Sequence, residues 1–156
     1  MSPFPRLFKE SLGMRFLRGF THKYLLAVVM IGVAACGLPV DPRHTTDTVR
    51  GGTLRAGLVG DQAQMEFDTA QLKSLAQTRQ AELHVVKGTT DELIELLSKG
   101  ELDVVASLPK KTPYRKQVGL TQTFAHPGWP KPRVWAVRSG ENEWLIVLND
   151  HLGDSK

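Results

Sequence analysis

The sequence predicts an α/β fold, a three-layer lobe in which helices flank a mostly parallel sheet. Two observations carry this prediction. Strand-like and helix-like segments alternate from residue 51 to residue 106, and the connections between them are short. An apolar run at 102–106 is typical of a strand that is covered on both faces. The order β-α-β-α-β with short connections implies parallel strands joined by right-handed crossovers.

The best-defined helix is predicted over 89–99. Thr89 and Glu92 have the spacing of a capping box, so their side chains can satisfy free amides at the helix start. Apolar residues recur along one face, and Gly100 can adopt the positive φ that ends a helix. The strand at 102–106 follows, and then a basic loop. Because ligands in open α/β sheets usually bind at the carboxyl ends of strands, a site is expected in this loop.

The other elements before this helix are predicted from weaker patterns. The fold starts at Gly51, and apolar residues alternate through a first strand in the following segment, TLRAGL. A helix is predicted from Asp68, its expected cap, to about Arg79. The second strand is predicted at 81–86.

The end of the chain is less regular. Three prolines interrupt any element between 124 and 133, and a fourth strand is predicted at 134–137. Asn142 can cap a final helix with an apolar face, which is expected to end at Gly153 and to leave a polar tail over 153–156.

Residues 1–36 have the form of a signal peptide. A cationic stretch precedes about twelve mostly apolar residues at 24–35, too few for the ~20 of a membrane span. The run ends in VAAC, which resembles a lipobox, so Cys36 is the predicted lipidation site. The alternative is an uncleaved membrane or amphipathic helix, and Met14 is an alternative start. Residues 37–50 lack apolar periodicity and are predicted to be a flexible tether.

Charge and cysteine content exclude several classes of function. The formal charge is +4, but residues 1–36 carry all of it, since residues 37–156 hold equal numbers of basic and acidic residues. A globular part with zero net charge lacks the excess of positive charge that is typical of nucleic-acid-binding proteins. One cysteine allows no internal disulfide, and the five histidines have no spacing typical of a metal site, so no metal and no cofactor are predicted.

Several motifs together resemble the first lobe of family 3 extracellular solute-binding proteins, the receptors of amino-acid ABC importers. They are GGTLRAGLVGD at 51–61, LSKGELD at 97–103 and TPYR at 112–115. The segment VWAVRSGENEWL at 134–145 is similar to the stretch that returns from the second lobe. A full member has roughly a hundred more residues between these parts, whereas here only 125–132 fill that place. The resemblance therefore implies a single periplasmic-binding-protein-like lobe over 51–152.

The resemblance also implies a site. Arg115 would bind a ligand carboxylate, because a guanidinium offers a planar fork of donors, and Thr112 and Ser107 would add polar contacts. The pattern alone favours a solvated charge run over 110–116. Without a second lobe the site is half open, so we expect binding to be weak, millimolar at best, or absent. The surface left uncovered is a candidate for homodimerisation.

The predicted function is that of a lipid-anchored, periplasm-facing binding component of an ABC importer for amino acids or other small carboxylates, and not of an enzyme. Its partners would be this ligand, a permease and the membrane. Three alternatives stay open: a partner-dependent sensor, a structural lipoprotein, and a non-functional truncated remnant. A dehydratase relative would need a positioned acid and base, which nothing in the sequence singles out.

Overall fold

Five strands form one mixed sheet in the order β2-β1-β3-β5-β4. The computed structural model describes residues 39–124 and 131–154. β1 (Thr53–Leu58) pairs in parallel with β2 (Glu82–Lys87) and with β3 (Val104–Pro109). β5 (Arg133–Arg138) is antiparallel to β3 and to β4 (Val118–Leu120), so β5 alone runs against the other strands. The predicted α/β fold with a mostly parallel sheet is confirmed.

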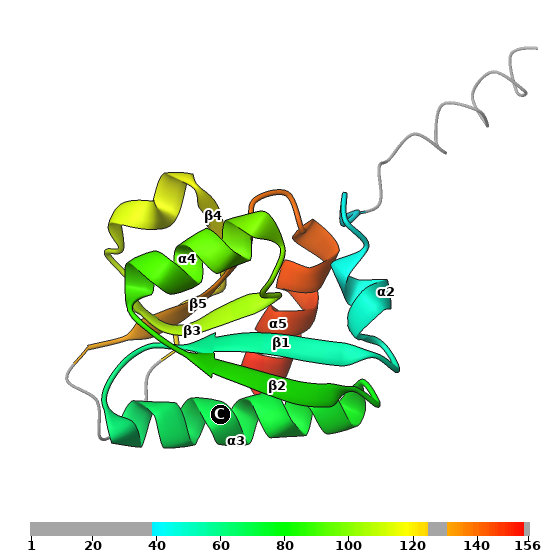
Figure 1. The fold of residues 1–156 in the computed structure, drawn as a ribbon, viewed down its shortest axis with the longest axis horizontal. Helices are drawn as coiled ribbons and strands as arrows, with labels where there is room; N and C mark the ends of the chain where they lie inside the picture. Colours follow the sequence, from blue (N-terminus) through cyan, green and yellow to red (C-terminus); the bar gives the residue numbers. More distant parts are fainter. Residues whose placement is uncertain (1–38, 125–130, 155–156) are drawn as a thin grey trace, which may run out of the picture. The chain divides into compact units, whose positions relative to one another are not determined.

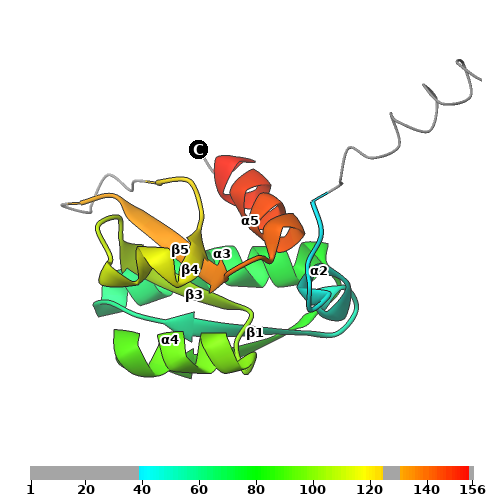
Figure 2. The same ribbon diagram turned by 90° about the horizontal axis from the view of Figure 1, so that it is seen from above.

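Helices cover both faces of the sheet. α3 (Gln62–Thr78) and α5 (Asn142–Asp154) lie on one face, and α4 (Thr90–Lys99) lies on the other, as Figures 1 and 2 show. β1 leads into α3 on one face and β2 leads into α4 on the other. In open sheets of this kind, ligands usually bind at the carboxyl ends of the strands.

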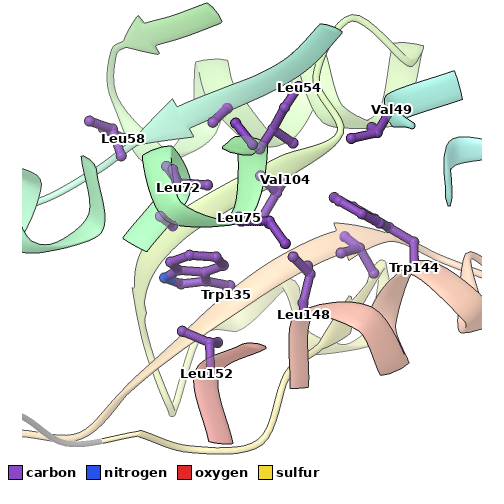
Figure 3. Packing of buried hydrophobic residues seen from close by; sticks show 14 of the residues in the cluster. Val49, Leu54, Leu58, Leu72, Leu75, Val104, Trp135, Trp144, Leu148 and Leu152 are labelled. Carbon is purple, nitrogen blue, oxygen red and sulfur yellow. The ribbon is translucent and has the colours of Figure 1, made fainter. Parts of the chain in front are cut away.

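Each face has its own apolar core. On the α3 and α5 side, the indoles of Trp135 and Trp144 are fully buried among leucines of both helices (Figure 3). On the α4 side, Leu93 and Leu97 pack against Val105 and Leu108 of β3. Burying a side chain of this size contributes roughly 1.5–3 kcal/mol, so the two clusters are the main source of stability.

The cap predicted for α4 is present. Thr89 N donates to Glu92 Oε2 over 2.9 Å, and Glu92 N donates to Thr89 Oγ1 over 3.4 Å. Gly100 has a φ of 84°, and its amide donates to Leu97 O over 3.1 Å. The prediction succeeded because every part of this signal lies within twelve residues.

The predicted start of α3 is wrong. The helix begins at Gln62, and Asp61 caps it by accepting from Gln64 N over 2.9 Å. Asp68 lies in the second turn, fully buried. The first two turns of α3 are mostly polar, so the sequence shows no apolar periodicity there. Asp68 resembles a cap in the local sequence because its actual partners, on β3 and β5, are distant in the sequence.

The flexible tether predicted over 37–50 is also corrected. α2 (Thr45–Val49) forms within it, and Val49 is fully buried. Asp41 accepts from Trp144 N over 2.9 Å at the start of α5, while Glu141 accepts from Arg43 N over 3.1 Å. Each segment thus caps the other. These bonds join residues about a hundred positions apart, so the local pattern could not reveal them.

Two smaller differences concern the end of the chain. β4 forms at 118–120, where only a loop was expected, and α5 runs past Gly153 to Asp154. The predicted signal peptide and Cys36 lie outside the described residues. None of the helices in the described part of the chain is long and apolar enough to cross a membrane.

Candidate binding site at the carboxyl ends of the strands

β3 is interrupted by a bulge at Ser107. Val105 pairs with Ala136 and Leu108 pairs with Val134, so two residues of β3 face one residue of β5. Ser107 has a φ of 58°, a left-handed conformation that a serine adopts only when its surroundings hold it there. The extra residue turns Leu108 to the α4 side of the sheet. The bulge therefore sets the direction in which the chain leaves β3.

Asp68 of α3 hydrogen-bonds the residue at this bulge. Its carboxylate accepts hydrogen bonds from the Ser107 hydroxyl and from Trp135 Nε1, the second over 2.9 Å. Burial raises the pKa of Asp68 to about 6, although these two bonds and the charge of Arg133 favour the ionised form. Arg133 Nη1 in turn donates to Ser107 O over 3.1 Å. The Ser107 side chain is thus turned into the core, where its hydroxyl already has a partner.

The loop after β3 is folded into a short helix, η1 (Pro113–Lys116). Thr112 caps it by accepting from Tyr114 N over 3.4 Å, and Pro113 fits the first position because it has no amide hydrogen to satisfy. The Tyr114 hydroxyl donates to Asp91 at the start of α4, which raises the pKa of the phenol. η1 is therefore fastened to α4, and the following residue, Arg115, is left exposed.

Arg115 and Thr112 lie together on the wall of an open hollow of about 600 Å³. The hollow is lined by three cationic side chains, three threonines and two aliphatic residues: Lys110, Lys111, Arg115, Thr112, Thr121, Thr123, Leu120 and Val134. We call it the basic hollow. Two of the three expected contact residues line it, whereas Ser107, fully buried, does not. Among the described residues, no carboxylate forms an ion pair with the Arg115 guanidinium.

The far wall of the basic hollow comes from the segment after β4. Thr121 exchanges bonds with the backbone of Trp135: its amide donates to Trp135 O over 2.9 Å, and its Oγ1 accepts from Trp135 N over 2.9 Å. Phe124 pairs with Arg133, with both backbone bonds within 3.0 Å. These contacts fix the segment on β5, so one wall of the basic hollow is held by the sheet and the other is formed by η1 and the loop before it.

Sequence reasoning missed Lys110, Lys111, Thr121 and Thr123, and a charge pattern could have revealed the two lysines. Residues 107–138 contain seven Lys or Arg and no Asp or Glu. Because residues 37–156 balance to zero overall, the rest of that part carries an equal excess of acidic residues. The zero net charge of residues 37–156 therefore conceals a strongly basic segment at 107–138. All residues that line the basic hollow belong to this segment.

The arrangement suits a small anion. Arg115 can offer two parallel N–H donors to a carboxylate. The hydroxyls of Thr112 and Thr121 already accept from backbone amides, but each keeps an O–H that can donate to a ligand. Leu120 and Val134 provide an apolar floor for a short aliphatic part of a ligand. A hollow of this volume is within the usual range for small-molecule sites.

Comparisons with known proteins support the fold. Neither a protein-family model nor a curated protein matches the sequence. Among solved structures, the arginine-bound form of domain 1 from TmArgBP is similar, with 24% identity, a TM-score of 0.57, and coverage of 67% of this chain and 94% of that domain. A mutant of the same domain gives a TM-score of 0.60 at 24% identity, covering 70% of this chain and 97% of that one.

A second kind of protein has the same fold. The ancestral amino-acid-binding protein AncCDT-1, described as a precursor of cyclohexadienyl dehydratase, gives a TM-score of 0.59 at 16% identity and covers 70% of this chain and 92% of that one. At such identities the likeness concerns the fold. The described residues, 39–124 and 131–154, therefore have the fold of a single lobe of an amino-acid solute-binding protein, as the motifs predicted.

Proposed function

We propose that this chain is an amino-acid-binding component of the cell envelope in which Arg115 binds the ligand carboxylate and Thr112 adds a hydroxyl contact. One observation carries the proposal: the Arg115 guanidinium lies exposed on the wall of the basic hollow, beside Thr112, at the carboxyl end of the sheet. An exposed arginine without a carboxylate partner keeps its donors available for a ligand. Ser107 would act from beneath, by fixing the path of the chain into the loop.

A single lobe is sufficient for such a role in principle. TmArgBP domain 1 is a solved structure of one domain in an arginine-bound form, so this fold can hold an amino acid without a second lobe. We expect weak binding here, because an open half-site leaves the ligand in contact with water. An exposed arginine–carboxylate pair contributes up to ~1 kcal/mol. A millimolar dissociation constant requires about 4 kcal/mol in total, so we expect millimolar binding at best.

The proposed function also includes a membrane anchor and two protein partners. Cys36 would carry the lipid that anchors the protein to the membrane, and an ABC permease would receive the ligand. A second copy of the chain could cover the surface that a second lobe covers in full-length relatives. In the anchored form, Cys36→Ser should release the protein from the membrane fraction, and recovery of the variant in that fraction at the wild-type level would contradict lipidation at this residue.

The binding test compares two neighbouring cations. Full-length protein, Arg115→Ala and Lys116→Ala are titrated with amino acids by saturation-transfer NMR, which detects millimolar complexes. Lys116 is the control because it is exposed and does not line the basic hollow. We expect Arg115→Ala to weaken binding about fivefold and Lys116→Ala to leave it within twofold. A flat titration, or equal effects of both substitutions, would count against the proposed function.

A further inference from the structure

The charge of the basic hollow distinguishes one class of ligand from others. Lys110, Lys111 and Arg115 all line it, and all three are exposed. No Asp or Glu is among its lining residues. The connecting segment 125–132 has none either, as the sequence alone establishes. Three cations around one small hollow repel one another, and a bound anion relieves this repulsion.

Two acidic side chains that contact the elements beside the basic hollow already have hydrogen-bond partners. Asp91 accepts from the Tyr114 hydroxyl and so holds η1 on α4. Asp68 is fully buried and accepts from Ser107 and Trp135. Neither carboxylate lines the basic hollow, so nothing there can pair with the ammonium or guanidinium group of a cationic side chain.

We propose that the basic hollow selects a ligand with two carboxylates, such as a short dicarboxylic amino acid, over neutral and basic amino acids. This inference rests on the proposed function and names its substrate class. Arg115 takes the α-carboxylate, because its fork fits one carboxylate bidentately. The second carboxylate lies near Lys110 and Lys111, whose ammonium groups act as point charges on flexible stems and need no fixed geometry. The basic hollow thus differs in preference from the arginine-bound domain with the same fold.

The test uses three ligands that differ mainly in side-chain charge. L-glutamate, L-glutamine and L-arginine are titrated into the full-length protein at low salt, with the double variant Lys110→Gln/Lys111→Gln and the control Lys116→Gln. Glutamine matches glutamate in shape but lacks the second charge. We expect glutamate to bind about tenfold more tightly than glutamine, and arginine to bind most weakly. Because exposed charges are screened, this preference should shrink at 0.5 M salt.

The variants separate this inference from the proposed function. In the double variant we expect glutamate and glutamine to bind equally, while Lys116→Gln keeps the preference. If glutamine or arginine binds as tightly as glutamate, and Arg115→Ala still weakens binding while Lys116→Ala does not, the dicarboxylate inference is wrong and the proposed function stands. If the preference persists in the double variant, the lysines do not cause it and the inference is equally wrong. Absence of binding by all three ligands would overturn both.

Discussion

The two ends of the sheet use cationic side chains in opposite ways. At the amino ends of the parallel strands, Arg55 and Arg138 gather around Gly100 and Asp103 beside a small hollow of about 160 Å³. At the carboxyl ends, Lys110, Lys111 and Arg115 surround a hollow of about 600 Å³. The first group has partners in the fold, whereas the second faces solvent. The comparison separates cations that hold the lobe together from cations that are available to a ligand.

The pairing at the amino end is extensive. Arg55 Nε donates to Asp103 Oδ2 over 3.0 Å, Arg55 Nη2 donates to Asp103 Oδ1 over 2.5 Å, and Arg55 Nη1 donates to Gly100 O over 2.8 Å. Arg138 donates to Leu97 O over 3.3 Å and pairs with Glu141 over 3.7 Å. These arginines therefore stabilise the carboxyl end of α4, where the helix dipole favours positive charge, and join it to β1 and β5.

The largest expected effect comes from breaking this pairing. Arg55→Ala leaves the Asp103 carboxylate, whose side chain is 2% exposed, without its bidentate partner. Removing one member of a buried pair typically costs 3–5 kcal/mol, and we expect about 3 kcal/mol here because the arginine is 34% exposed and water can partly replace it. Urea denaturation of the full chain measures this loss. Arg115→Ala is the matched control. Equal losses of unfolding free energy in the two variants would show that the cations at the two ends of the sheet do not differ in their contribution to stability.

A second prediction concerns the one buried carboxylate at the carboxyl end. The pKa of Asp68 is about 6 in the folded protein against an ordinary value of 3.8, so the folded state holds this proton more tightly than the unfolded state does. Its contribution to stability is complete below about pH 4 and is lost as the pH rises through 6. Two units of pKa correspond to on the order of 2–3 kcal/mol. Asp68→Asn cannot ionise and should lack this decline.

The measurement is the free energy of unfolding of both proteins between pH 4 and pH 7. The difference between the variant and the wild type should move in the variant's favour across this range. The control is Asp61→Asn, which changes an exposed carboxylate at the start of the same helix. Parallel pH profiles of the wild type and Asp68→Asn would show that Asp68 is not the group responsible.

What the sequence could predict depended on how far apart the interacting residues are. The capping box of Thr89 and Glu92, the end of α4 and the alternating strands depend on neighbours, and their prediction succeeded. The packing of Asp41 on α5 and the position of Asp68 depend on partners 39 or more residues away, which no local pattern encodes. At the candidate site, Arg115 and Thr112 of the motif both line the basic hollow, and their role as ligand contacts stays a prediction. The inward turn of Ser107 depends on a bulge and on Asp68, so only the structure could reveal it.

The smallest expected effects are changes in the free energy of unfolding when exposed lysines are neutralised. The change should be positive for lysines without an acidic partner and negative for a lysine that pairs with a glutamate. Lys110→Gln/Lys111→Gln removes charges that repel Arg115, so it should raise the free energy of unfolding by a few tenths of a kcal/mol at low salt. Lys99→Gln removes a cation that pairs with Glu95 over 2.6 Å and should lower it. Both changes should fade in 0.5 M salt because these side chains are exposed. Careful thermal denaturation at two salt concentrations can resolve them. A loss of stability in the double variant would mean that the lysines hold the fold, as Arg55 does, and that the basic hollow is not a surface kept free for an anion.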